Sequence, residues 1–419
     1  MPKVNVCDQP MISTAGPSTG EKVFAIFVLL LSTGAFLNLG LNPNSDFETG
    51  RTGMEVVWFL LYVGTILLFF RHCKGAKDRL KKEVWLILLL TFTFASVLWS
   101  EFPAFTARRA IALICTTLFG VYFAMRYSLR QQLRLLSVAF MVAAVASVFF
   151  QLFGWGTNLA AEGVAGWIGV YFQKQLLGMN MAFATAVLLI LIKSDPEYRS
   201  WAWIGSILSF ALLVLSRSAT AIVLFLCLFT AFPLRRVLRK SVRAVVFVGV
   251  LTVPMAAYSA VWSFRNLDKV TGFLGRDATL TGRVPLWILC TVMALQKPWL
   301  GYGYNAFWQG GEGSTVNRVV GWMPNSAHNG FLEIWLGLGL VGLGLFAITF
   351  LIYLKRAVTF LRTVRSAESV WPLLFLILVL LCSLTQATIL IRNNIFWIMY
   401  VAVGLTSLHL PVVPLKPTE

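Results

Sequence analysis

Apolar runs of about 20 residues recur along the whole chain, and a helix of that length spans the hydrocarbon core of a bilayer. The runs are continuous rather than alternating, which is typical of transmembrane helices and excludes a transmembrane β-barrel. Hydrophobic residues make up 58% of the chain and charged residues 12%, too little polar cover for a soluble domain. The sequence therefore predicts an all-α, polytopic membrane protein.

The runs predict about twelve transmembrane helices, and an even number places both termini on the same side. The expected spans lie near 23–41, 54–70, 84–99, 110–125, 135–153, 176–192, 201–215, 220–234, 244–261, 334–354, 370–385 and 388–408.

Lysine and arginine residues are distributed unequally between the two sides of the membrane in this predicted topology. The formal net charge is +18, and 23 of the 35 cations fall in the two tails and in alternate loops. The positive-inside rule makes that side cytoplasmic, so both termini are expected in the cytoplasm of a bacterial inner membrane. The charge is thereby explained by orientation in the bilayer, and no nucleic-acid partner is expected.

One external loop is much longer than the others, and loops of such length are usually functional or disordered. Its aromatic content and its lack of low-complexity runs favour an ordered loop. The predicted division is a cytoplasmic tail at 1–22, nine transmembrane helices within 23–261, a periplasmic loop with catalytic motifs at 262–333, three transmembrane helices within 334–408, and a cytoplasmic tail at 409–419.

Cysteine and histidine spacing gives no indication of a metal centre. None of the six cysteines forms a CxxC pair, and most fall inside apolar runs, so they are interpreted as small core residues. No second histidine or carboxylate lies at metal-ligand spacing from His328. No metal and no cofactor are expected. The polar first 20 residues contain no apolar core, so we expect no cleaved signal peptide.

Two arginines on the predicted outer face are candidates for binding an anion. Arg217 lies in SRSAT, between two apolar runs that leave almost no spacer, and Arg283 precedes an apolar helical stretch. A snorkelling arginine that anchors a span is the alternative for Arg217. Guanidinium groups bind phosphate through paired donors, and helix N-termini also favour anions.

Two polar motifs flank the last third of the predicted loop. GYGYNAFW, which contains Tyr302 and Tyr304, predicts a tight turn that displays aromatic rings, suited either to sugar stacking or to a membrane interface. SAHNGFLE contains His328, Asn329 and Glu333 just before an apolar run. A neutral imidazole with an ordinary pKa near 6.5 accepts a proton from an alcohol near pH 7. A histidine that only caps a helix is the alternative.

Two further cations belong to the same predicted face. The segment that begins WSEFP at 99–103 leads into Arg109, and WIGVYFQKQ at 167–175 contains Lys174. Each could equally belong to an interfacial aromatic belt.

Taken in order along the chain, these motifs resemble the O-antigen ligase and polymerase superfamily of bacterial envelopes. The resemblance rests on SRSAT, GRDATLTGR, GYGYNAFW and SAHNGFLEIWLGLGLVGLGL, supported by WSEFPAFTARR and WIGVYFQKQLLG, and it covers roughly residues 80–390. The wording of GRDATLTGR and GYGYNAFW is most similar to the exopolysaccharide polymerase (ExoQ-type) branch.

The resemblance implies a metal-independent glycosyltransferase of about twelve helices that works outside the inner membrane. Its donor would be a glycan on an undecaprenyl-pyrophosphate carrier, and its acceptor another carrier-linked repeat unit or lipid A–core. By resemblance, Arg217 and Arg283 would hold the pyrophosphate and His328 would activate the acceptor hydroxyl. Tyr302, Tyr304, Asn329, Glu333, Arg109 and Lys174 are secondary candidates for substrate binding.

Three alternatives remain open at this point. A polymerase and an O-antigen ligase share this chemistry and differ in the acceptor, which the sequence does not identify. A transporter of polysaccharide or lipid-linked sugar would require polar or broken helices at mid-membrane depth, whereas most of the predicted spans are apolar. A lone base with no nucleophilic carboxylate favours direct displacement with inversion at the sugar.

Overall fold

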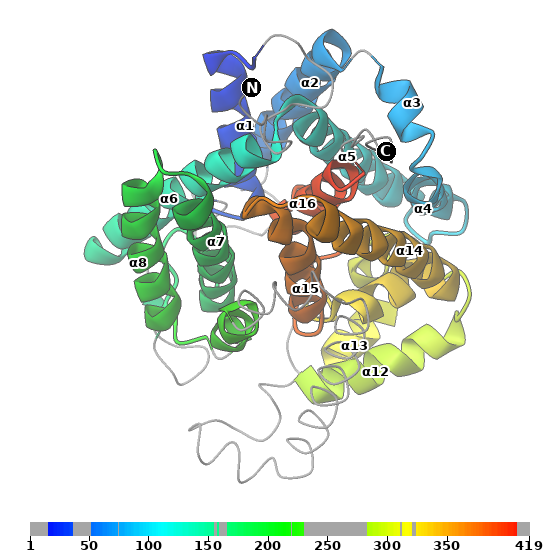
Figure 1. Cartoon of the computed structure of the whole chain (residues 1–419). Helices are drawn as coiled ribbons and strands as arrows, with labels where there is room; N and C mark the ends of the chain where they lie inside the picture. The colour runs from blue at the N-terminus through cyan, green and yellow to red at the C-terminus, as the bar shows by residue number, and fades with distance from the viewer. Residues whose placement is uncertain are drawn as a thin grey trace.

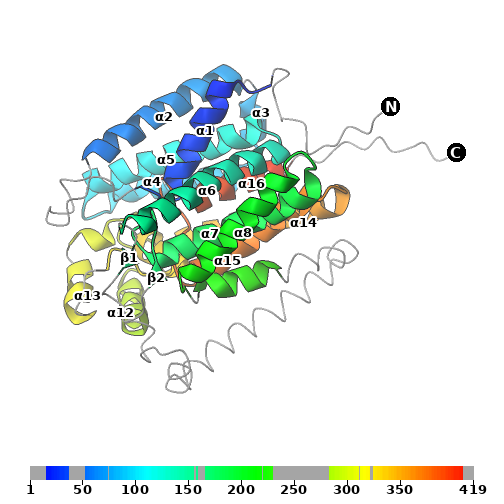
Figure 2. The same ribbon diagram turned by 90° about the vertical axis from the view of Figure 1, so that its left-hand side faces the viewer.

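The computed structural model is a bundle of α-helices, shown from one end in Figure 1 and from the side in Figure 2. It describes residues 16–36, 52–73, 75–154, 157–158, 166–218, 220–229, 283–310, 312–320 and 324–408. The helices of four or more turns are α2 (Thr52–His72), α5 (Pro103–Arg126), α6 (Leu129–Leu152), α7 (Lys174–Ser194), α8 (Arg199–Leu215) and α14 (Gly330–Thr363). The shorter ones are α1 (Thr19–Ser32), α3 (Ala76–Leu80), α4 (Val84–Ala95), α12 (Arg283–Gln296), α13 (Glu312–Val320), α15 (Trp371–Ser383) and α16 (Ile395–Thr406).

Five of the described helices, α2, α5, α6, α7 and α14, are long and apolar enough to cross a membrane. Six shorter apolar helices accompany them, among them Thr220–Phe229. The prediction of an all-α polytopic membrane protein is confirmed at this level, while a count of twelve spans is not. The span expected at 244–261 lies outside the described residues. A two-residue strand pair, β1 (Thr157–Asn158) with β2 (Gly166–Trp167), is a small departure from all-α.

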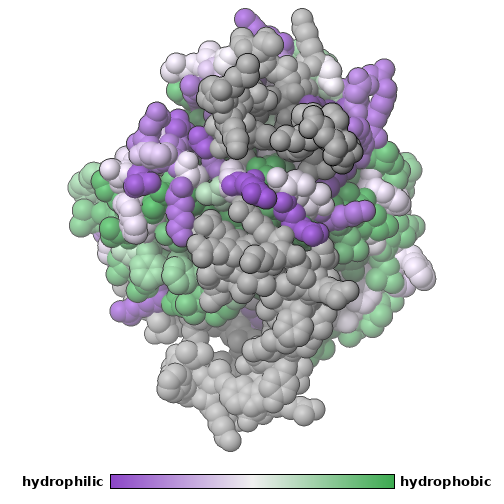
Figure 3. All heavy atoms as spheres, viewed as in Figure 1, coloured by the Kyte–Doolittle hydropathy of each residue, from purple (hydrophilic) through white to green (hydrophobic). Residues whose placement is uncertain are grey.

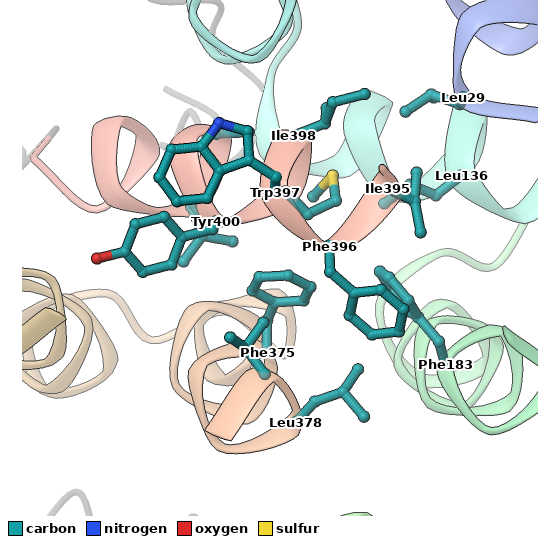
Figure 4. Close-up of a cluster of buried hydrophobic side chains, with 14 of the residues drawn as sticks. Leu29, Leu136, Phe183, Phe375, Leu378, Ile395, Phe396, Trp397, Ile398 and Tyr400 are labelled. Carbon is teal, nitrogen blue, oxygen red and sulfur yellow. The ribbon is translucent and has the colours of Figure 1, made fainter. Parts of the chain in front are cut away.

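Large apolar side chains fill the centre of the bundle, where α7, α15 and α16 meet. Every residue of α16 is buried, and the Phe183 ring of α7 lies 5.5 Å from Trp371 and 5.7 Å from Phe396 (Figure 4). Outward-facing side chains on α2 and α8 are also apolar: Phe59 is 64% exposed and Ile207 is 66% exposed. An apolar core inside an apolar surface is what a bundle surrounded by lipid requires.

Buried and half-buried arginines tie the helices together at one end of the bundle, the end that faces the viewer in Figure 3. In that view, hydrophilic residues cross the middle and hydrophobic residues form the edge on both sides. Glu21 caps α1 together with Ser18 and also accepts hydrogen bonds from the Arg126 guanidinium, with 2.7 Å from Nε to Oε2. Ion pairs in apolar surroundings are stable only when both partners are present. The pairs at this end are Arg126–Glu21, Arg130–Glu368, Arg134–Asp195 and Arg356–Glu83.

Helix α14 is broken at Gly339, which has φ +66° and ψ −169°. The segment 298–303 docks into the break and pairs with the backbone groups that the break sets free. Amides of Tyr302 and Gly303 donate to the carbonyls of Leu336 and Gly337, at 2.8 and 3.0 Å. In return, the amides of residues 340 and 341 donate to the carbonyls of residues 298 and 299. Protein backbone therefore supplies four hydrogen bonds at the break that lipid could not supply.

The last predicted span is also discontinuous. Helix α16 begins at Ile395, and residues 384–394, of which 388–394 were expected to be helical, form a non-helical connection from α15. Within this connection, Asn393 accepts hydrogen bonds from the hydroxyls of Tyr62 and Thr116, which lie near the middle of α2 and α5. The connection thus reaches half-way into the bundle. Polar backbone at this depth is tolerated only where protein surrounds it.

The predicted external loop contains regular structure of its own. Helices α12 and α13 fall within 262–333, and residues 262–282 lie outside the described part of the chain. A second, smaller hydrophobic core joins these two helices to the start of α14. It includes Leu286 and Cys290 of α12, Val316 of α13, and Leu332 and Leu336 of α14. This core fixes the motif-bearing segments relative to one another.

Candidate active site

His328 lies in a short turn that several neighbours hold in place. The Ala327 amide donates to Glu333 Oε2 at 2.8 Å, and its carbonyl accepts from Trp287 Nε1 at 2.9 Å. His328 itself has a φ of +48°, a left-handed conformation that a non-glycine residue adopts only when its surroundings impose it. The helix cap is the next residue, Asn329, whose Oδ1 accepts from the amides of residues 331 and 332. The imidazole is therefore free of the capping role that was the alternative for it.

The imidazole of His328 is half-buried beside Arg283 and Gln386. Its Nδ1 lies 3.2 Å from Gln386 Oε1. Burial lowers the pKa of the imidazole, and the positive charge of Arg283 lowers it further, while the bond to Gln386 acts in the opposite direction. The expectation of an ordinary pKa is therefore corrected downward, because desolvation and a nearby cation both disfavour the charged ring. Both effects favour the neutral form of the ring, the form that a general base requires.

Arg283 opens α12, as its position before the apolar stretch predicted. Its Nη1 donates to the carbonyl oxygen of Thr385 at 3.2 Å. Thr385 and Gln386 are neighbours in the connection between α15 and α16, so adjacent residues hold the guanidinium and the imidazole. The structure thus brings Arg283 and His328 together, although they are far apart in the sequence, because both contact the same short segment.

Arg217 lies in the turn between α8 and the helix Thr220–Phe229, with a φ of +49° and an exposed side chain. The turn packs closely on α7: a Cβ on Gly178 would lie 2.8 Å from Ser216 Oγ and 3.1 Å from Ser218 Cβ. The carbonyl and hydroxyl of Ser218 accept from the amides of Ile222 and Ala221, which begins the helix Thr220–Phe229. The Arg217 guanidinium makes no hydrogen bond or ion pair with another described residue.

Lys174 begins α7 and belongs to the same group as Arg217. Its side chain is 2% exposed and passes Gly166 of β2, where an added Cβ would lie 3.2 Å from Lys174 Cδ. The same Cβ would lie 2.5 Å from the Ser216 carbonyl oxygen, so β2, Lys174 and the Arg217 turn are packed together. Among the described residues, no hydrogen bond joins Arg217 to Arg283 or His328, and the candidates form two groups.

Four of the secondary candidates contact other residues of the protein and support the structure of the site. Tyr302 and Tyr304 are buried, and their hydroxyls donate to the carbonyls of Met293 at 2.9 Å and Leu390 at 2.6 Å. The expectation of displayed rings is wrong for both, because Tyr302 is buried in the second core and Tyr304 in the main core of the bundle. Glu333 uses both carboxylate oxygens on Ala327 and Trp308, and Asn329 caps α14.

Arg109 lies near a small cavity beside the site. Its guanidinium sits 4.5 Å above the Phe105 ring. Burial raises the pKa of the Tyr304 phenol, and the positive charges of Arg392 and Arg109 oppose that shift, which places both arginines close to this ring. The cavity is lined by Tyr304, Asn305, Glu333, Ile334, Gly337, Leu338, Ile389, Leu390 and Ile391.

The sequence interpretation missed Gln386 and the segment around it. It assigned 370–385 and 388–408 to two spans and left only a short gap between them. The available signal was the polar run Ser383, Thr385, Gln386 and Thr388 inside an otherwise apolar stretch. In a membrane protein, such a run marks backbone that lines a site or a cavity.

Comparison with known proteins agrees with the resemblance noted in the motifs. The family described as O-antigen ligase matches residues 204–347, a stretch that contains Arg217, Arg283 and His328. The exopolysaccharide production protein ExoQ of Rhizobium meliloti (strain 1021) is 26% identical over 347 residues, which cover 79% of this chain and 75% of ExoQ. The predicted resemblance is thereby confirmed. With the apolar helices, these matches indicate a multi-pass bacterial membrane protein of polysaccharide biosynthesis.

Proposed function

We propose that the protein is a glycosyltransferase that polymerises lipid-linked repeat units of an exopolysaccharide or O-antigen at the periplasmic face of the inner membrane. The donor would be a glycan on undecaprenyl pyrophosphate and the acceptor a hydroxyl of another glycan. The observation that carries the proposal is the imidazole of His328, which Gln386 supports beside the Arg283 guanidinium that Thr385 holds. A base beside a guanidinium suits attack by an alcohol on a carbon that carries a phosphate leaving group.

In the proposed reaction, Nε2 of His328 takes the proton of the acceptor hydroxyl. The hydroxyl oxygen forms the new bond to the anomeric carbon while the bond from that carbon to the pyrophosphate oxygen breaks. Undecaprenyl pyrophosphate leaves with the bonding electrons, and Arg283 and Arg217 stabilise its growing charge. The acceptor oxygen displaces the pyrophosphate directly, without a carboxylate nucleophile, so the transfer inverts the anomeric configuration. The proposed reaction needs no metal.

Three observations support Arg217 as the second phosphate-binding residue. Its guanidinium is exposed, its turn is fixed on α7 by close packing, and a helix N-terminus follows directly. Amides at a helix N-terminus favour anions, and a guanidinium binds two phosphate oxygens at once. Lys174, at the start of α7, would add positive charge next to the same turn.

The proposed orientation places the His328 end of the bundle in the periplasm and the arginine-paired end, with both chain termini, in the cytoplasm. Most lysines and arginines lie at the cytoplasmic end under this assignment, as the positive-inside rule requires. The native Cys73 is only 5% exposed, so introduced cysteines are needed to test the orientation by labelling.

Cysteine labelling checks the orientation in a cysteine-free background. Val319→Cys on α13 and Asp78→Cys on α3 replace exposed residues at opposite ends of the bundle. In cells with a permeabilised outer membrane, an impermeant thiol reagent should modify residue 319 and leave residue 78 unmodified until the inner membrane is broken. The reverse pattern would invert the assignment.

Polymerase and ligase activities are distinguished by the glycans of a deletion strain. The name of the similar ExoQ protein refers to exopolysaccharide production, which favours the polymerase. Loss of the gene should remove long exopolysaccharide and leave single carrier-linked repeat units, while lipopolysaccharide keeps its normal capping. Lost capping with normal exopolysaccharide would instead assign the ligase activity.

A transporter of lipid-linked sugar is the candidate from another class, and the broken helix α14 and the connection 384–394 are features of that class. Here the groups freed at Gly339 bond to 298–303, and Asn393 bonds to Tyr62 and Thr116. Protein groups already bond to these breaks, so they are not available to bind a transported substrate. The breaks therefore favour the transferase over the transporter.

A further inference from the structure

Three consecutive residues that follow α15 each contact one residue of the candidate site. The carbonyl of Leu384 accepts from Asn329 Nδ2 at 3.5 Å, and the carbonyl of Thr385 accepts from Arg283 Nη1 at 3.2 Å. The third contact, between Gln386 Oε1 and His328 Nδ1 at 3.2 Å, is the one made by a side chain. Gln386 is therefore placed to control the state of the imidazole.

A neutral imidazole carries one N–H, and the partner of one ring nitrogen decides which nitrogen holds that hydrogen. An amide oxygen can only accept a hydrogen bond. With Gln386 Oε1 facing Nδ1, the proton belongs on Nδ1, and the lone pair of Nε2 is left available to an acceptor hydroxyl. The positive charge of nearby Arg283 also favours the amide oxygen over the amide NH2 on this side.

We propose that Gln386 is a positioning residue that holds His328 in the Nδ1–H tautomer, so that Nε2 acts as the base. The inference rests on the proposed function, because it specifies how the same base is prepared. It adds a residue from the connection between α15 and α16 to the site.

The surroundings of Gln386 keep its side chain in register with His328. The backbone amide of Gln386 donates to the Cys382 carbonyl at 2.9 Å. The backbone carbonyl oxygen of Gln386 would lie 3.5 Å from a Cβ on Gly330. The hydroxyls of Ser383 and Thr388 are 2.7 Å apart and close the turn on both sides of it. The start of α14 and the turn that bears Gln386 are thus packed directly on each other.

The neutral amide matters because a carboxylate at the same place would stabilise the imidazolium. Among the described residues, the charged or titratable side chains near this region include Arg283 of α12 and Glu333 of α14, and Glu333 is bound to Ala327 and Trp308. An uncharged Gln386 orients the ring and leaves the effect of Arg283 intact. The imidazole then stays unprotonated over a wider acidic range.

Two substitutions separate orientation from charge. Gln386→Glu keeps the acceptor and should move the acid limb of the transfer-rate profile upward by about one pH unit, because an adjacent carboxylate raises the pKa of the imidazole. Gln386→Leu removes the acceptor and should lower kcat by roughly 10–100-fold, the usual cost of losing a partner that orients an active histidine. Thr388→Val is the matched control, because it disturbs the same turn without a contact to His328, and its acid limb should coincide with that of the parent.

A second readout needs no substrate. The chain has three histidines, so ¹⁵N-histidine NMR of the full-length protein in nanodiscs, assigned with His328→Ala, reports the tautomer directly. The parent should show Nδ1–H for His328, and Gln386→Leu should show a mixture of tautomers. An Nε2–H tautomer in the parent, or an unmoved acid limb in Gln386→Glu, would overturn the inference. A parent that shows Nδ1–H but transfers no glycan would count against the proposed function alone.

Discussion

Replacing His328 by alanine should lower glycan transfer by roughly 100–10,000-fold, the range that a positioned general base contributes. The side chain lies in a turn that Glu333, Trp287 and Asn329 hold through bonds to other residues. The variant should therefore fold, insert and bind the donor as the parent does. Transfer from a purified lipid-linked donor, measured with donor binding on the same preparations, separates the loss of chemistry from the loss of binding.

His72→Ala provides the matched control, since His72 ends α2 near Glu21, at the opposite end of the bundle. Its transfer rate per folded protein should equal that of the parent. A His328→Ala variant with near-parent transfer would make His328 structural and would assign acceptor activation to another group.

The parent should also remain active at lower pH than an ordinary imidazole allows. The base must be neutral, and burial together with Arg283 lowers the pKa of His328 below about 6.5. Activity should therefore persist to a lower pH than an imidazole of ordinary pKa allows, and it should fall as the pH drops through the lowered pKa. Arg283→Gln removes the nearby positive charge and so raises the pKa of His328. The residual activity of this variant should therefore begin to fall at a higher pH than that of the parent.

Arg283→Lys and Arg217→Lys should each reduce transfer by roughly 100–1000-fold, the typical effect of removing one donor from a developing negative charge. A lysine keeps the charge but loses the planar pair of donors that a phosphate accepts. In Arg283→Lys, the bond to the Thr385 carbonyl is also lost, which frees the start of α12 from the His328 support. The loss should appear mainly in kcat, because the leaving group carries more negative charge in the transition state than in the bound substrate.

Arg108→Lys is the control for these substitutions. Arg108 is an exposed arginine at the same end of the bundle, and its Nη1 lies 3.5 Å from Glu55 Oε1. Exchanging it should change transfer by less than about twofold, because exposed ion pairs contribute little. Parent-like activity in both Arg283→Lys and Arg217→Lys would remove the basis for the pyrophosphate role.

Signals from neighbouring residues in the sequence predicted most of the local features of the candidate site. The tight turn at Arg217 follows from two apolar runs with no spacer, and the start of α12 at Arg283 follows from a charged residue before an apolar stretch. The segment around His328 was also recognised as a junction between a loop and a helix. Each of these predictions depends only on residues that are close together in the chain.

Contacts between distant segments were beyond such reasoning. The break at Gly339 lies in a glycine-rich apolar run that satisfies every criterion for one continuous helix, and it forms because 298–303 supplies the missing hydrogen bonds. Gln386 meets His328 across 58 residues of sequence. Tyr302 and Tyr304 look like displayed rings in a glycine-rich turn, but distant segments bury them: Tyr302 lies in the second core and Tyr304 in the main core of the bundle.

The central claim is that this chain transfers glycan from a pyrophosphate carrier with His328 as the base. The most direct measurement uses the purified full-length protein, a defined undecaprenyl-pyrophosphate-linked repeat unit, and EDTA in the buffer. The account predicts glycans of two or more repeat units with an inverted new linkage, and no such products with His328→Ala. A parent protein that leaves the donor unchanged, that requires a divalent metal, or that works equally well without His328 would contradict it.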